Sequence, residues 1–254
     1  KERLDALVYR RGLADSIDEA RRMILAGQIA VSGLARAKAD LLVDPDIDLI
    51  VRDAARYVSR GATKLAEALR AFDIGPAGWV AADVGASTGG FTDLLLQRGA
   101  VRVYAIDVGR GQLHWRLRQD PRVVVMEGCN ARYLAALPEP IDLAVVDVSF
   151  ISLEVVLPAV VGWLRTAGQV IALVKPQFEA PSELVERGGV VRASSVHHLV
   201  LERVTSFALG QGWAVRGLVR SPIRGPKGNV EFLLALAPGG WPGEQDMGSL
   251  IERV

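Results

Sequence analysis

Ionisable side chains stand where several apolar segments of the chain begin or end. Asp83, Asp107 and Asp147 each close a segment that reads as a buried strand. Lys175 follows the most apolar segment, and Glu231 opens the last one. A cation at the end of a buried strand needs partners, because an unpaired buried charge is costly, and Asp147 and Glu231 are the natural ones. Several such strand ends at one sheet edge predict a site where carboxylates and an ammonium group act together.

A turn of small residues follows the first of these segments. An apolar run ends in Asp83, the residues from Gly85 to Gly90 form the turn, and apolar residues at helical spacing come next. Glycines here allow a tight turn and a close approach of backbone to a ligand. A dinucleotide site would carry glycine where this chain has Ser87. The pattern D-x-G-x-x-x-G-G therefore indicates a ligand without phosphates beside the strand end.

The next two strand ends extend this predicted ligand site. Asp107 lies roughly 20 residues after the turn, where a carboxylate can accept hydrogen bonds from ribose hydroxyls. The third strand leads to Glu127 and Asn130. The predicted cofactor-binding residues are Asp83, Gly85, Ala86, Ser87, Thr88, Gly89, Gly90, Phe91, Asp107, Glu127, Asn130 and Asp147.

Strands and helices alternate from residue 80 onward, which predicts an α/β domain with a parallel sheet covered on both faces. The loop 221–229 is too short for a parallel crossover, so the last strand should be antiparallel. Seven strands with this ending are typical of the Rossmann-like S-adenosylmethionine-dependent methyltransferase domain. The predicted strands span 80–83, 102–107, 122–126, 142–147, 169–174, 213–219 and 231–236, and the predicted helices lie near 62–72, 90–98, 110–118, 152–165 and 194–210.

Residues 1–58 form a separate, small α+β unit. Ser16 followed by Glu19 predicts a capping box that opens a helix through Ala26, and a short strand follows Gly27. This pattern resembles the αL RNA-binding module of a small-subunit ribosomal protein and many pseudouridine synthases. In that module basic helix residues contact the RNA backbone. The resemblance implies RNA binding by Arg3, Arg10, Arg11, Arg21, Arg22, Arg36 and Lys38.

Four motifs together resemble the TlyA (hemolysin A) family. They are GASTGGFT at 85–92, DVSFISL at 147–153, KPQFE at 175–179 and GNVEF at 228–232. The segment SRGATKL at 59–65 resembles the linker of that family. The resemblance implies an αL domain at 1–58, a linker at 59–63 and an FtsJ-like methyltransferase domain at 64–254. It also implies S-adenosylmethionine as cofactor and 2′-O-methylation of cytidine in ribosomal RNA within ribosomal subunits, which influences sensitivity to ribosome-targeting antibiotics.

The resemblance places a catalytic tetrad on Lys64, Asp147, Lys175 and Glu231. A ribose 2′-hydroxyl is a poor nucleophile, so a base must take its proton. Lys175 can do so only in its neutral form, which burial and a neighbouring cation such as Lys64 would favour. Asp147 and Glu231 would favour the charged form and orient it. The sequence leaves open which effect prevails.

Composition sets limits on these interpretations. The chain has 254 residues and a net charge of +1, so any RNA-binding surface must be local. Only five of its 30 cationic residues are lysines, which makes each internal lysine informative. The single cysteine, Cys129, excludes a disulfide framework and a cysteine-based zinc site. No run of 18 apolar residues and no leader is present, so we expect a cytoplasmic protein without a metal and without a membrane partner.

Three other functions remain open. A ribosome-binding protein without activity could retain the fold, although the intact turn and tetrad argue against it. A membrane-lytic protein would fit the hemolysin label, but the apolar segments of this chain are too short to span a membrane. A base-modifying RNA methyltransferase would carry Asn/Asp-Pro-Pro-aromatic where this chain has 147–150, or a catalytic cysteine. The sequence also leaves open which ribosomal RNA is modified.

Overall fold

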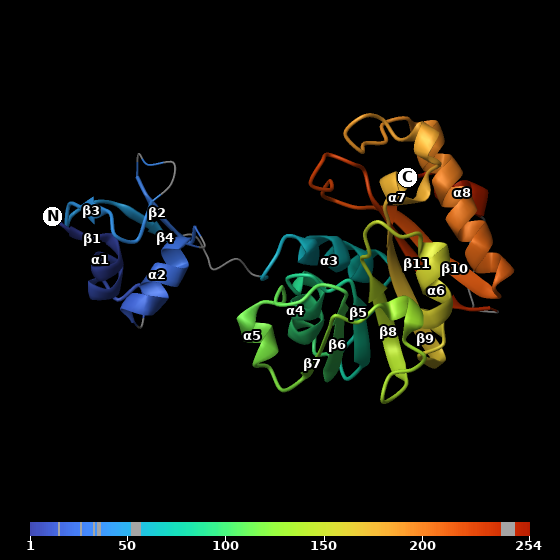
Figure 1. Cartoon of the computed structure of the whole chain (residues 1–254), viewed down its shortest axis with the longest axis horizontal. Helices are drawn as coiled ribbons and strands as arrows, with labels where there is room; N and C mark the ends of the chain where they lie inside the picture. The colour runs from blue at the N-terminus through green and yellow to red at the C-terminus, as the bar shows by residue number, and fades with distance from the viewer. Residues whose placement is uncertain (15, 26, 33, 35–36, 52–56, 240–246) are drawn as a thin grey trace. The chain divides into compact units, whose positions relative to one another are not determined.

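The structure, a computed structural model, describes residues 1–14, 16–25, 27–32, 34, 37–51, 57–239 and 247–254. The chain divides into two compact units, Lys1–Arg56 and Tyr57–Val254 (Figure 1). Each unit has its own hydrophobic core.

The N-terminal unit consists of two helices, which are α1 (Leu4–Arg10) and α2 (Ile17–Leu25), and two small antiparallel sheets. The predicted cap of α2 is confirmed, because Ser16 Oγ accepts a hydrogen bond from the Glu19 backbone N–H at 3.1 Å. The predicted end of this helix, Ala26, lies outside the described residues. One sheet pairs β1 (Glu2–Arg3) with β3 (Leu42–Val43), and the other pairs β2 (Ile29–Val31) with β4 (Leu49–Val51).

A buried carboxylate connects the two helices of this unit. Asp5 is fully buried, and its Oδ2 lies 2.8 Å from Arg3 Nη2 and 2.8 Å from Arg21 Nε. It also accepts a hydrogen bond from the Ala6 N–H at 2.9 Å. The Arg3 and Arg21 guanidinium groups hold the pKa of Asp5 well below its usual range, Arg3 having the larger effect. Two cations of the predicted RNA-binding set therefore also stabilise the fold of the unit.

The C-terminal unit is built on a seven-stranded sheet with the order β10-β11-β9-β8-β5-β6-β7. Pairing from β9 to β7 is parallel, whereas β11 is antiparallel to both of its neighbours, as the short loop before it predicted. The strands are β5 (Val80–Val84), β6 (Arg102–Asp107), β7 (Val123–Glu127), β8 (Ile141–Val146), β9 (Leu164–Val174), β10 (Trp213–Arg220) and β11 (Phe232–Pro238).

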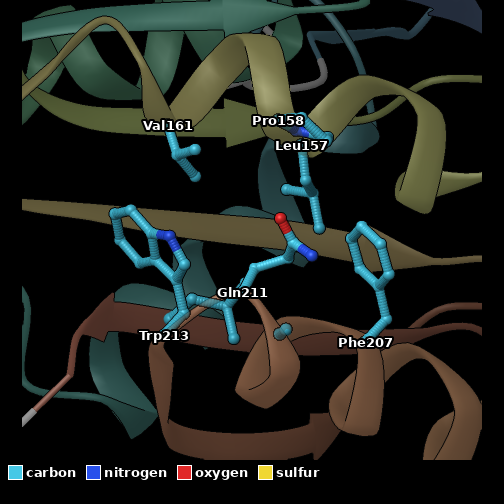
Figure 2. A pocket seen from close by; sticks show the side chains of 8 residues that line it. Leu157, Pro158, Val161, Phe207, Gln211 and Trp213 are labelled. Atoms are coloured by element: carbon cyan, nitrogen blue, oxygen red, sulfur yellow. The ribbon is translucent and has the colours of Figure 1, made fainter.

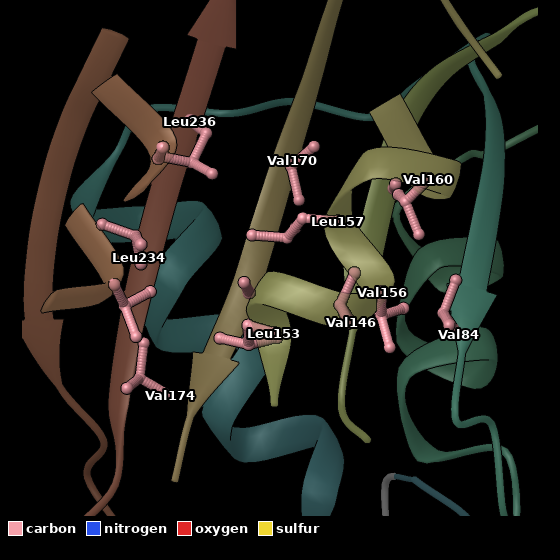
Figure 3. Packing of buried hydrophobic residues seen from close by; sticks show 14 of the residues in the cluster. Val84, Val146, Leu153, Val156, Leu157, Val160, Val170, Val174, Leu234 and Leu236 are labelled. Carbon is pink, nitrogen blue, oxygen red and sulfur yellow. The ribbon is translucent and has the colours of Figure 1, made fainter. Parts of the chain in front are cut away.

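Helices cover both faces of this sheet (Figure 1). Alternate residues of β9 point to opposite faces, so Val170 packs beneath α6 and α8 whereas Ile171 packs with α3 and α4. Figure 3 shows the first of these cores, in which α6 side chains such as Leu157 lie over the sheet. The helices are α3 (Gly61–Ala71), α4 (Gly90–Gln97), α5 (Trp115–Arg118), α6 (Leu153–Val161), α7 (Pro176–Glu179), α8 (Ser194–Gly210) and α9 (Met247–Glu252).

A small gap remains in the packing between α6, α8 and β10. It is a mostly apolar cavity of about 120 Å³ lined by Leu157, Val161, Phe207 and Trp213 together with four other residues (Figure 2). It shares no lining residue with the two cavities at the catalytic edge described below.

Several element boundaries differ from the prediction. The predicted helix 110–118 is reduced to its last turn, α5, because backbone N–H groups of residues 111–113 bind the Glu127 carboxylate instead of forming a helix. The helix α6 ends at Val161, and β9 begins at Leu164 rather than at 169. The short helix α7 after Lys175 was not predicted, and neither were three of the four short strands in the N-terminal unit.

Replacing Asp5 with Asn should destabilise the N-terminal unit by about 1–3 kcal/mol, the usual cost of losing hydrogen bonds to a charged group. Acid should act in the same direction on the wild-type chain. A carboxyl whose pKa is depressed by folding stabilises the fold above its unfolded pKa of about 3.9, and this stabilisation disappears as the pH falls below that value. Hydrogen exchange of the α1 and α2 amides in the full chain measures both effects.

Asp18→Asn is the matched control, since Asp18 also pairs with Arg21, at 3.0 Å, but is exposed. We expect it to change stability by less than about 0.5 kcal/mol. Equal exchange rates in the two variants would contradict a structural role for Asp5.

Candidate active site

The glycine turn passes directly beside the end of β8. Gly85 has φ +87°, and a Cβ at this position would lie 2.5 Å from the Asp147 backbone oxygen. Gly89 caps α4 in the left-handed region, and a Cβ there would lie 2.2 Å from Leu117. Both positions therefore require glycine. The turn after β5, which contains predicted cofactor-binding residues, therefore contacts the backbone just after β8.

The linker before α3 packs against the same turn. A Cβ at Gly90 would lie 2.2 Å from Ser59 Oγ, and this hydroxyl accepts a hydrogen bond from the Gly61 N–H at 3.2 Å. The Val58 N–H donates to the Asp93 carboxylate at 2.8 Å. The segment around Ser59 is thus anchored to the start of α4.

Asp107 organises the loop opposite the glycine turn. Its Oδ2 accepts a hydrogen bond from the Ser87 N–H at 2.8 Å, and its Oδ1 accepts one from the Gly109 N–H at 2.7 Å. Each carboxylate oxygen has two lone pairs, so Asp107 retains acceptor capacity for a ligand hydroxyl. It is thus both part of the cavity wall and a potential ligand contact.

A cavity of about 550 Å³ lies between this turn and the ends of β6, β7 and β8. Five of the predicted cofactor-binding residues line it, namely Gly85, Ser87, Asp107, Asn130 and Asp147. The other seven lie outside its lining: Asp83, Ala86, Thr88, Gly89, Gly90, Phe91 and Glu127. Val108, Gln112, Cys129, Ile151 and Val156 also line the cavity but were not predicted. Gln112 was missed because it lies within the predicted helix 110–118.

Glu127 anchors a loop rather than lining the cavity. Its carboxylate accepts hydrogen bonds from the Gly111 and Gln112 N–H groups at 2.9 and 3.1 Å and forms an ion pair with Arg118. These interactions, the Gly111 hydrogen bond first, lower the pKa of Glu127 to about 2. Glu127 therefore stays ionised and holds the loop that contributes Gln112 to the cavity.

Asp83 lies beneath the glycine turn and is 1% exposed. Its Oδ2 accepts hydrogen bonds from the Thr92 N–H at 2.8 Å and the Thr92 hydroxyl at 2.7 Å. Its Oδ1 has no hydrogen-bond partner among the described residues. Burial raises the pKa of Asp83 to about 7, and the nearby Asp147 carboxylate contributes to the increase.

The predicted tetrad forms two ion pairs in one cleft. Lys64 of α3 pairs with Glu231, which directly precedes β11. Lys175 Nζ, at the end of β9, lies 2.6 Å from Asp147 Oδ1. Both lysines are less than one-tenth exposed. The direct partner of each lysine is thus a carboxylate.

The cleft around these pairs has a volume of about 450 Å³. Lys175 Nζ also donates to Ser149 Oγ at 3.0 Å and lies 5.8 Å from the centre of the Phe178 ring. Phe150 is 89% exposed, has φ +63°, and its ring lies 4.8 Å from that of Phe178. The strained backbone at Phe150 holds an aromatic ring toward solvent beside the lysine. Sequence reasoning missed this pair of rings.

A buried carboxylate ties the helix that carries Phe178 to the loop that carries Phe150. Glu179 of α7 accepts hydrogen bonds from the Ser152 hydroxyl at 2.7 Å and the Leu153 N–H at 2.8 Å. Burial raises the pKa of Glu179. The motif 175–179 is therefore tied to the motif 147–153 at the start of α6.

The cations of the predicted RNA-binding set differ in their partners. Arg3 and Arg21 pair with Asp5, and Arg10 pairs with Glu2. Arg11 donates to the Pro45 backbone oxygen at 2.6 Å, and Lys38 is exposed. Arg22 also has an interaction within the chain, and Arg36 lies outside the described residues.

Comparison with known proteins agrees with this architecture. The model of the FtsJ-like methyltransferase family matches residues 57–238, and that of the S4 domain matches residues 2–46. The "16S/23S rRNA (cytidine-2'-O)-methyltransferase TlyA" of Mycobacterium tuberculosis is 48% identical over 240 residues, which cover 93% of this chain and 90% of that protein. "Hemolysin A" of Brachyspira hyodysenteriae is 39% identical over 91% of this chain and 98% of that protein.

A solved structure described as "Putative hemolysin from Streptococcus thermophilus" has a TM-score of 0.74 and 43% sequence identity. It covers 100% of this chain, and this chain covers 95% of it. The predicted methyltransferase fold and the predicted αL unit, which is the S4 domain, are both confirmed. The chain is a methyltransferase and belongs to the TlyA (hemolysin A) family, in which an S4 domain precedes an FtsJ-like methyltransferase domain.

Proposed function

We propose that the protein transfers a methyl group from S-adenosylmethionine to the ribose 2′-hydroxyl of a cytidine in ribosomal RNA. The observation that carries this proposal is the junction of the two cavities at the carboxyl edge of the sheet. One cavity contains the glycine turn and Asp107, and the other contains both lysine–carboxylate pairs. A donor in the first cavity would adjoin an acceptor in the second. The residues common to both linings are Gly85, Ser87, Asp147, Ser149 and Phe150.

The first cavity has the chemistry that S-adenosylmethionine requires. This cofactor carries positive charge and no phosphate, and Asp107 and Asp147 line the cavity while Asp83 lies beneath it. Oδ1 of Asp83 has no partner among the described residues and would gain one from a bound cationic group or a water. Glycine at position 85 lets the turn pack directly against the backbone after β8, where a Cβ would meet the Asp147 oxygen. When bound, S-adenosylmethionine supplies an electrophilic methyl group.

Lys175 has the position that the base must occupy. Asp147 and Ser149 hold its Nζ at 2.6 and 3.0 Å, which orients the amine into the cleft. In its neutral form Lys175 would take the proton of the 2′-hydroxyl, and the oxygen would bond to the methyl group as the bond from that methyl to sulfur breaks, with a neutral thioether as the leaving group. Asp147 lines both cavities and so fixes the base relative to the cofactor. Positioning of this kind accounts for much of the acceleration in a transfer between two bound groups.

The remaining cleft residues position the nucleotide. The Lys64–Glu231 pair forms one wall of the cleft and gives it a buried polar lining. The exposed face of Phe150 offers a surface on which an unstacked base can lie. The Ser149 hydroxyl can accept a hydrogen bond from the Lys175 ammonium group or donate one to the neutral amine, because a hydroxyl can do both.

We further propose that residues 1–58 supply affinity for RNA, that residues 59–63 link the domains and that residues 64–254 perform the chemistry. The M. tuberculosis relative is named as a methyltransferase of both 16S and 23S rRNA, and the S4 domain of this chain carries exposed cations such as Arg11 and Lys38. The protein would act in the cytoplasm, where ribosomal subunits are found. Loss of the methyl group would alter sensitivity to ribosome-targeting antibiotics. Mapping of 2′-O-methyl positions on rRNA from cells with and without the protein tests the substrate.

The alternatives make different predictions. A ribosome-binding protein without activity would not turn over S-adenosylmethionine, and a membrane-lytic protein would release dye from liposomes. Within the described residues, no helix is both long and apolar enough to cross a bilayer. A base-modifying enzyme would leave the methyl group on the nucleobase rather than on the 2′-oxygen, which the mapping experiment detects directly.

Lys175→Ala should lose methyl transfer to rRNA while retaining S-adenosylmethionine binding. Lys175→Arg should be almost as inactive, because a guanidinium group does not release its proton near neutral pH. Transfer of tritiated methyl groups measures activity, and calorimetry and thermal unfolding show that each variant still binds the cofactor and folds. Near-normal turnover by the arginine variant would show that the residue only positions charge.

Asp107→Ala should weaken S-adenosylmethionine binding by about 10- to 100-fold, the equivalent of losing one hydrogen bond to a charged group. Glu127→Gln is the matched control. It loosens the neighbouring loop but lies outside the cavity lining, so its effect on affinity should be smaller. Titration calorimetry compares the two variants. Equal losses would indicate that Asp107 acts only through loop geometry.

Arg11→Gln combined with Lys38→Gln should weaken rRNA binding and reduce its salt dependence, because neither cation forms an ion pair among the described residues. The slope of log affinity against log salt should fall by about 1 for each RNA phosphate that the variant no longer neutralises. Arg10→Gln, whose charge is already compensated by Glu2, should have a smaller effect. Filter binding at several salt concentrations provides the measurement. A slope equal to that of the wild type would argue against the S4 domain as an electrostatic anchor.

A further inference from the structure

A second polar cavity lies beside the catalytic cleft, between the start of α8 and the loop 220–230. Its volume is about 530 Å³, and its lining includes Arg192, Ser194, His198, Arg220, Arg224 and Lys227. No Asp or Glu side chain belongs to this lining, so far as the described residues show. In a chain of net charge +1, four arginines and lysines around one cavity constitute a strong local concentration of positive charge.

Most of this charge is not compensated locally. Arg192 pairs with Glu186, and Arg224 Nη1 donates to the Gly228 backbone oxygen at 3.1 Å. Arg220 and Lys227 have no carboxylate within ion-pair distance in the part of the chain that the structure describes. The first turn of α8 also contains no acid, so its helix dipole adds to the positive potential. The cavity is therefore chemically suited to an anion.

The walls of this cavity are held in place by a buried amide. Asn229 is 2% exposed, and its Oδ1 accepts a hydrogen bond from the Val191 N–H at 2.9 Å. Its Nδ2 donates to the Gly189 backbone oxygen at 2.9 Å. The segment before α8 and the loop before β11 are thus bound to each other. Backbone segments fixed in this way lose less entropy when the cavity binds an anion than flexible segments would.

The same loop borders the catalytic cleft. Lys227 lines both cavities, and Glu231 of the tetrad follows it by four residues. A Cβ at Gly225 would lie 2.5 Å from Glu231 Oε1, so this loop packs closely against the tetrad. A chain of nucleotides with one residue in the cleft would therefore extend past Lys227 into the basic cavity.

We infer that the basic cavity binds a backbone phosphate of the RNA strand that carries the target nucleotide. This inference rests on the proposed function and adds to it a second RNA contact, separate from the S4 domain. Guanidinium groups suit this role because their planar fork can donate two hydrogen bonds to one phosphate. Arg220 and Arg224 would hold the phosphate, and Lys227 would guide the strand between the two cavities. The site would set which nucleotide reaches Lys175.

The double variant Arg220→Gln/Arg224→Gln tests this inference in the full chain. We expect the KM for rRNA to rise about tenfold and the slope of log affinity against log salt to fall by about 1. The kcat and the S-adenosylmethionine affinity should stay within twofold of the wild type, because neither arginine lines the other two cavities. Arg220→Lys/Arg224→Lys keeps the charge and should recover most of the affinity.

Arg98→Gln is the matched control, since Arg98 is an exposed arginine that caps the C-terminal end of α4, at the sheet edge opposite the catalytic residues. The inference would be overturned if the double glutamine variant had the same RNA affinity, salt slope and KM as this control. A fall in kcat at constant KM would also overturn it, because it would place the arginines in the chemistry. If the wild-type chain neither binds nor methylates rRNA, the proposed function itself fails. Thermal unfolding shows whether the double glutamine variant is misfolded. If it is, the RNA affinity and KM of Arg220→Lys/Arg224→Lys are compared with those of the wild type instead.

Discussion

Two buried lysines must be neutralised at one edge of the sheet, and much of the catalytic domain is arranged around this requirement. Lys64 and Lys175 are each less than one-tenth exposed, and each has a carboxylate partner. Leaving either ammonium unpaired in this environment would cost several kcal/mol. The four side chains come from α3, the end of β8, the end of β9 and the start of β11. One pair forms only where α3 meets the start of β11, and the other only where the ends of β8 and β9 lie side by side.

The antiparallel last strand makes this meeting possible. Parallel strands such as β8 and β9 bring their carboxyl ends to one edge, so Asp147 and Lys175 lie there by topology. A parallel β11 would place Glu231, which precedes it, at the opposite edge. Because β11 runs antiparallel to β9 and pairs with it, its first residues lie beside the last residues of β9. Phe232 is thus opposite Val174, and Glu231 lies at the sheet edge that carries Asp147 and Lys175.

Close packing of the glycine turn against β8 couples the two halves of the site. Gly85 lies so near the Asp147 backbone that a Cβ would not fit between them, so the glycine turn packs directly against the chain at the end of β8. Asp107 and Glu127 hold the opposite wall by binding backbone N–H groups, and Glu179 does the same for the loop that carries Phe150. Buried or ionised carboxylates that accept backbone hydrogen bonds therefore appear repeatedly as the means of fixing loops in this domain.

The sequence by itself determined the succession of the seven strands of the large sheet, the two-domain plan, the S4 helix cap at Ser16, the glycine turn and the antiparallel last strand. These features depend on local patterns, since side-chain period, turn residues and loop length act within a few positions. Only the tertiary structure decided that Lys175 pairs with Asp147 and Lys64 with Glu231, or that Glu127 anchors a loop. It also decided that Arg220 and Arg224 share a cavity with the start of α8. Such pairings join residues as many as 167 positions apart in the sequence. Whether two such side chains meet depends on how the strands and helices pack together, and no local pattern encodes that.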